Sequence, residues 1–252
     1  MSDRTPSSAG STGSQEPGPK RFELPHPAVR RWAEASTVLF LLMGLIFAFS
    51  VDFLLPDVRD LPFVRDDLPI ADSELHGNHI RLTLITKAAV VIGALVAITW
   101  LVWQFLAHVN ARALSGRKGR LMPALGVIAW LVPGVNLIAP PLVMRRLLRA
   151  SDPDVVSSEE KSLGRSSFLV WLWWAGWLAG WTLLYIAFRP VIDGDPTPSE
   201  LITRDHFAIA ASLVAIPTAL VAAILIHQVN ARQLLKEDRL EFRDWVGWSK
   251  SA

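Results

Sequence analysis

The sequence predicts an all-α membrane protein with four transmembrane helices, and two observations lead to this fold class. The chain has 252 residues, 51% of them hydrophobic, and its mean hydropathy is +0.33. The apolar residues gather in long blocks, which is typical of chains that span a bilayer. Four blocks reach the ~20 apolar residues that a spanning helix needs; they lie at roughly 36–55, 82–107, 167–188 and 207–229.

The regions outside these blocks set the domain boundaries. Residues 1–30 are expected to form a disordered cytoplasmic tail, because they are rich in Ser, Gly and Pro. Residues 31–232 form the polytopic membrane domain. Residues 233–252 form a second cytoplasmic tail, whose mixture of apolar and charged side chains is compatible with an interfacial helix.

The first two blocks form a hairpin with one charged residue near the outer part of each helix. Asp52 lies near the outer end of the first block, and Lys87 lies about two turns inside the second. Charges inside a membrane usually pair or serve a pathway, so one hypothesis is an Asp52–Lys87 pair. The alternative is that Lys87 extends outward to the interface, where Asp52 also lies.

A fifth apolar block, within residues 121–150, is interrupted by Pro133 and Gly134 and again by Pro140 and Pro141. We expect a re-entrant or interfacial broken helix there, and a proline-kinked span is the alternative. Basic residues flank the block on both sides. If the block returns to its starting side, 19 Lys and Arg lie inside and 5 outside, whereas a span gives 11 inside and 13 outside. The positive-inside bias therefore favours re-entry.

The break itself is a candidate binding site formed by Pro133, Gly134 and Asn136. A backbone break at membrane depth frees polar groups that lipid does not satisfy, so it must be buried in protein or line a wet cavity. Transporters use such breaks to bind ions or carboxylates. The structural alternative is that Pro133 and Gly134 make a turn and Asn136 caps the returning helix.

The second hairpin, at 167–188 and 207–229, contains a tryptophan stripe and a Gly-x-x-x-Gly pair. The stripe faces lipid or the broken block, while Gly176 and Gly180 allow close helix packing. Pro217 is expected to kink the last helix.

The sequence Val-Asn-Ala-Arg occurs twice, with Asn110 and Arg112 at the end of the second block and Asn230 and Arg232 at the end of the fourth. The pattern is typical of a helix stop. Two parallel structural repeats are the alternative. If the broken block re-enters, these ends lie on the same side as Arg145 and Arg146, where an anionic lipid headgroup is a further candidate ligand.

These residues also carry a family resemblance. The segments Trp130-x-x-Pro133-x-x-Asn136-Leu137-x-x-Pro140 and Val143-Met144-x-x-Leu147 resemble the core signature of the bacterial membrane family called domain of unknown function 4328. The segments Asn110-Ala111-Arg112-Ala113-Leu114-x-Gly116 and Trp171-x-x-Trp174 fit its pattern too, so the resemblance covers roughly 80–232. The resemblance implies a polytopic bacterial membrane protein and no established activity.

Function is expected from contacts rather than catalysis. The sequence has no nucleophile elbow, phosphate-binding loop or zinc-protease motif, so we expect no enzyme, no cofactor and no metal site. Net charge is only +2, and no nucleic-acid partner is expected. The expected protein is a structural or regulatory component of the bacterial inner membrane with both termini in the cytoplasm. Its expected partners are membrane lipids, including anionic headgroups, and further copies of the chain; a small transporter or channel is the alternative.

Overall fold

The computed structural model describes residues 26–60, 72–115, 123–153, 164–193 and 198–251, and every regular element within them is helical. The long helices are α1 (His26–Asp60), α2 (Asp72–Leu114), α5 (Gly164–Asp193) and α6 (Pro198–Ser251). Between α2 and α5 lie three short elements, α3 (Pro123–Leu131), the 3-10 turn η2 (Val135–Leu137) and α4 (Ala139–Ala150).

Each long helix contains a segment that is long and apolar enough to cross a membrane. These segments are Ala28–Asp52, Leu84–Leu114, Ser167–Arg189 and Ile202–Leu240. Most of their side chains are not buried inside the protein, as expected for helices whose outer faces meet lipid. The predicted all-α membrane protein with four spanning helices in two hairpins is therefore confirmed.

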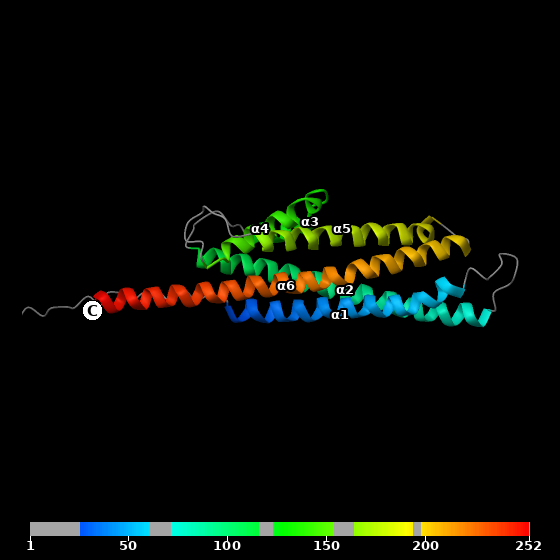
Figure 1. The fold of residues 1–252 in the computed structure, drawn as a ribbon, viewed down its shortest axis with the longest axis horizontal. Coiled ribbons are helices and arrows are strands. Elements are labelled where there is room, and N and C mark those ends of the chain that lie inside the picture. The colour runs from blue at the N-terminus through cyan, green and yellow to red at the C-terminus, as the bar shows by residue number, and fades with distance from the viewer. Residues whose placement is uncertain (1–25, 61–71, 116–122, 154–163, 194–197, 252) are drawn as a thin grey trace, which may run out of the picture.

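The long helices run side by side as a bundle (Figure 1). Helix α1 packs against α2 and α6, and α5 packs against α6. The short helices α3 and α4 lie on the α5 side of the bundle and contact both α2 and α5. The broken element thus joins the first helix pair to the second, and the buried core includes Trp100 and Trp103 of α2 and Trp173 and Trp174 of α5.

Close helix packing explains two of the small residues. A Cβ on Gly44 of α1 would stand 3.7 Å from the Cβ of Ala219 on α6, and a Cβ on Gly176 of α5 would overlap the Thr218 hydroxyl. Gly180 has nothing within 4 Å of its Cβ position, so only the first glycine of the predicted pair brings α5 close to α6. Pro217 lies inside α6, which continues past it.

Two predicted boundaries differ from the structure. Helix α1 already begins at His26, so 26–30 belong to the first helix, and residues 1–25 of the predicted disordered tail lie outside the described residues. The predicted tail from 233 is not a separate segment, because α6 continues unbroken to Ser251 and extends beyond the bundle (Figure 1).

Candidate functional site: the broken element and the polar junction at its end

The break between α3 and α4 follows from two adjacent residues. Pro133 has no amide hydrogen and disfavours helical geometry in the residue before it, so α3 ends at Leu131. Gly134 then adopts φ +80°, a left-handed conformation that favours glycine. The chain reverses direction at this point, and α4 begins at Ala139 with prolines in its first turn, where a missing amide hydrogen costs nothing.

The turn pairs its own backbone groups. The amide of Asn136 donates to the carbonyl of Val132 at 3.0 Å, and Leu137 and Ile138 donate to carbonyls three residues earlier. The indole of Trp174 on α5 donates to the carbonyl of Leu137 at 3.1 Å.

The side chains at the turn do not enclose a ligand. Pro133 and Gly134 are exposed, and the half-buried side chain of Asn136 makes no hydrogen bond within the described part of the chain. The expected wet cavity is therefore not needed to satisfy the break, and the transporter alternative gains no support from this turn.

Trp130 anchors the element to the bundle. Its ring lies 5.9 Å from that of Trp100 on α2 and between 5.8 and 5.9 Å from those of Trp173, Trp174 and Trp177 on α5. Most of these pairs meet edge to face, the arrangement that aromatic quadrupoles favour. The predicted tryptophan stripe thus meets the broken element over part of its length.

Both ends of the broken element lie at one end of the bundle. Ser115 directly follows α2, and its hydroxyl lies 3.5 Å from the carbonyl oxygen of Ala150, the last residue of α4. Helix α3 has nine residues, a rise of about 13 Å, less than half of the ~30 Å hydrocarbon core. The element therefore goes out along the bundle and returns to the end of the bundle at which it started.

A buried amide links three helices at this end. The side-chain nitrogen of Gln233 on α6 donates to the carbonyl of Ala107 on α2 and to the hydroxyl of Ser151 after α4, each at 3.0 Å. Its oxygen accepts from the amide of Asn110 at 2.8 Å. Asn110, Ser151 and Gln233 are all buried. Such hydrogen bonds fix the relative position of helices where lipid offers no alternative partner.

Cations from α6 cap the carboxyl end of α4. The ammonium of Lys236 donates to the carbonyl of Ala150 at 2.8 Å, and Arg232 reaches the carbonyl of Leu148 at 3.4 Å. Arg232 also lies 3.7 Å from the carboxylate of Asp152. These contacts place positive charge at the negative end of the helix dipole. We call the contacts among Asn110, Gln233, Ser151, Arg232 and Lys236 the polar junction.

The two Val-Asn-Ala-Arg copies are not equivalent. Asn110 is buried and bonded, whereas Asn230 is half-buried with no side-chain hydrogen bond in the described chain. Arg112 is exposed, whereas Arg232 binds α4. The helix-stop interpretation holds for the first copy, because α2 ends at Leu114, and is wrong for the second, because α6 continues to Ser251.

The first hairpin does not form the hypothesised charge pair. Asp52 and Lys87 are both exposed, and no ion pair joins them among the described residues. Nothing in their contacts separates them from ordinary interfacial charges.

Sequence reasoning missed a buried polar stripe on α2 beneath the broken element. Gln104 and His108 are one turn apart and buried, and the ring of His108 donates from Nδ1 to the carbonyl of Gln104 at 2.7 Å. Gln104 also contacts the sulfur of Met144 on α4 at 3.6 Å. The side-chain oxygen of Gln104 and Nε2 of His108 have no hydrogen-bond partner among the residues that the structure describes. Their four-residue spacing is the one signal in the sequence that could have pointed to them.

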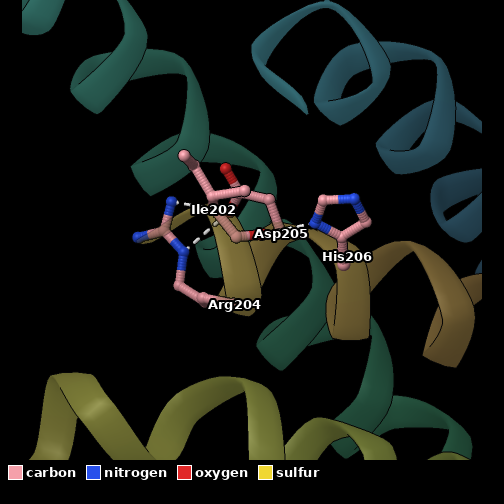
Figure 2. A network of polar contacts seen from close by, with 4 residues as sticks. All are labelled: Ile202, Arg204, Asp205 and His206. Atoms are coloured by element: carbon pink, nitrogen blue, oxygen red, sulfur yellow. Dashed lines mark hydrogen bonds and ion pairs between the residues drawn. The ribbon is translucent and has the colours of Figure 1, made fainter. Parts of the chain in front are cut away.

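A buried ion pair lies at the opposite end of the bundle. Asp205, near the start of α6, is buried, and its carboxylate accepts from the guanidinium of its neighbour Arg204 at 2.7 and 2.8 Å (Figure 2). The ring of His206 bonds instead to the carbonyl of Ile202 in its own helix (Figure 2). A buried carboxylate requires a partner, and Arg204 provides one. The ion pair therefore has a structural role and does not indicate a ligand site.

Comparison with known proteins places these features in a family. A family described as Domain of unknown function (DUF4328) matches residues 66–231. The chain belongs to this family. The match includes α2, α3, the turn, α4 and α5, together with Asn110 and Ser151 of the polar junction. It ends within α6, just before Arg232, Gln233 and Lys236, and α1 lies outside it. No curated protein and no solved structure matches the chain.

Proposed function

We propose that this DUF4328 protein is a multi-pass protein of the bacterial inner membrane with both termini in the cytoplasm. Its broken element enters the bilayer from the cytoplasmic side and returns. The protein acts through contacts with lipid and with other helices, as a structural or regulatory component, and not as a catalyst.

The observation that carries this proposal is the contact between Ser115 and Ala150. It brings the two ends of the broken element to one end of the bundle, which is the arrangement that the positive-inside rule favours. Trp174 contacts the turn and lies two helical turns from Ser167, where the apolar segment of α5 starts. The tip therefore reaches a depth of about 10 Å.

The exposed side chains of the element support a lipid-facing role. Leu131, Leu137 and Ile138 are all more than half exposed, and they surround the turn. Exposed apolar side chains at this depth meet acyl chains without a further protein partner.

Topology mapping tests the proposal. The chain contains no cysteine, so single-cysteine variants Gly119→Cys, Ser158→Cys and Pro196→Cys can be labelled in intact cells with a membrane-impermeant maleimide. We expect labelling of Pro196→Cys only, and labelling of all three after permeabilisation. If Gly119→Cys and Ser158→Cys label on opposite sides of the membrane, the element spans and the proposal is wrong.

A further inference from the structure

The outward face of α4 is apolar where the helix begins and basic where it ends. Leu142, Arg145, Arg146 and Arg149 are three or four residues apart, which places them on one side of the helix. Ile138, which precedes the helix, is 68% exposed and continues the apolar part toward the turn. The opposite side is buried in the core; its residues are Val143, Met144, Leu147 and Leu148.

The arginines of this face have no counter-ion among the described residues. None of Arg145, Arg146 and Arg149 forms an ion pair within the described part of the chain. Other arginines are paired there, for example Arg30 with Glu34, Arg204 with Asp205, and Arg232 with Asp152. The cations of α4 are therefore available to an anion from outside the described residues.

Arg145 gives an additional indication. Its Nε is buried and has no hydrogen-bond acceptor in the described part of the chain, while its neighbours Arg146 and Arg149 are exposed. A buried charged donor without an acceptor is costly, and an oxyanion on the arginine side of α4 would supply acceptors. Guanidinium groups bind phosphate oxygens in a forked geometry that suits this role.

The order of residues along the face selects the kind of anion. A free phosphate would use the arginines only, and would leave Leu142 and Ile138 exposed. A phospholipid matches both parts, because its phosphate lies at the interface and its acyl chain points toward the membrane centre. The basic end of α4 lies where α2 ends, and the apolar end lies at the turn.

We propose that the outward face of α4 binds an anionic phospholipid, with its phosphate at Arg145, Arg146 and Arg149 and an acyl chain along Leu142 and Ile138. This rests on the proposed function, since it requires the turn to lie deeper in the bilayer than the end of α4.

Native mass spectrometry of the full-length protein tests the site. The protein is titrated with phosphatidylglycerol and with phosphatidylcholine of identical acyl chains, and inorganic phosphate is added as a competitor. We expect phosphatidylglycerol to bind more tightly. Because a basic residue near a membrane surface contributes about 1 kcal/mol, Arg145→Gln/Arg149→Gln should weaken that binding by about 25-fold and Arg146→Gln alone by about fivefold.

The matched control removes the same charge elsewhere. Arg30→Gln/Arg31→Gln removes two exposed arginines from α1 and should leave the affinity unchanged. Equal loss in both double variants means that bulk charge explains the binding, and equal affinity for the two lipids means that there is no anionic site. Full displacement by millimolar phosphate means that the ligand is free phosphate. Each of these results overturns the inference. None of them changes the expected cysteine labelling, which tests the proposed function independently.

Discussion

At the scale of single residues, one missing methyl group sets the distance between α3 and α2. A Cβ on Gly126 would stand 2.9 Å from Nδ1 and 3.0 Å from Cε1 of His108. The ring is held in place, because its Nδ1 donates to the carbonyl of Gln104. The neighbour is therefore a rigid ring with a fixed bond, and not the flexible end of a side chain that moves at little cost.

Gly126→Ala should destabilise the protein by about 1–3 kcal/mol, the usual range for overpacking a well-filled contact. Thermal unfolding in detergent, followed by circular dichroism, measures the effect. His108→Ala should relieve the overlap, so the double variant should lose less stability than the two single variants predict together. Simple additivity would mean that the contact does not limit the approach of α3.

At the scale of elements, the broken helix is held at two places of different character. Trp130 fixes its outgoing half through ring contacts with α2 and α5. The returning half is fixed by the polar junction, in which Gln233 bonds to both α2 and the end of α4. The first attachment consists of aromatic ring contacts, and the second consists of buried hydrogen bonds, so they should respond differently to substitution.

Gln233→Ala should destabilise the protein by about 1–3 kcal/mol for each buried group left without a partner, here the side-chain amide of Asn110 and the hydroxyl of Ser151. Gln228→Ala is the matched control, because Gln228 lies on the same helix and makes no side-chain hydrogen bond in the described chain. Urea or detergent denaturation of the two variants compares them. Similar losses would show that the junction contributes nothing beyond ordinary packing.

The sequence predicts the helices and the break better than it predicts the polar contacts between helices. The four spans follow from length and hydropathy, because a segment that crosses a bilayer must be a long apolar helix with its backbone groups paired internally. The break follows from Pro133 and Gly134. The role of Gln233 does not follow, because its partners on α2 are more than 120 positions away. The continuation of α6 was also missed, because nothing in a polar tail distinguishes an extended helix from a separate interfacial one.

At the scale of the whole molecule, two parts of the chain connect the α1–α2 pair to the α5–α6 pair. One is the broken element between α2 and α5. The other is α6, which packs against both α1 and α5. The α5–α6 contact is close at Gly176, where an added Cβ would overlap the Thr218 hydroxyl. That hydroxyl already donates a hydrogen bond to the carbonyl of Val214, at 2.7 Å, in the turn of α6 that contains Pro217.

Gly176→Leu should therefore separate α5 from α6 and lower the yield of folded protein. Gly176→Ala should be milder, and Thr218→Ala should restore part of its loss. Gly180→Ala is the control, since its Cβ position is open, and we expect a change within about 0.5 kcal/mol. Size-exclusion profiles and melting temperatures in detergent report the outcome; equal sensitivity at 176 and 180 would contradict the packing argument.

The ring contacts that hold the broken element also make the tryptophan spectrum sensitive to its position. Seven tryptophans are linked through them: Trp100, Trp103, Trp130, Trp173, Trp174, Trp177 and Trp181. The chain has 11 in total, so most of its ultraviolet absorption and emission arises from one connected group. Indoles at such short separations couple electronically, and Trp130 is the member contributed by the broken element. Displacement of that element therefore changes the near-ultraviolet circular dichroism of the purified, unlabelled protein.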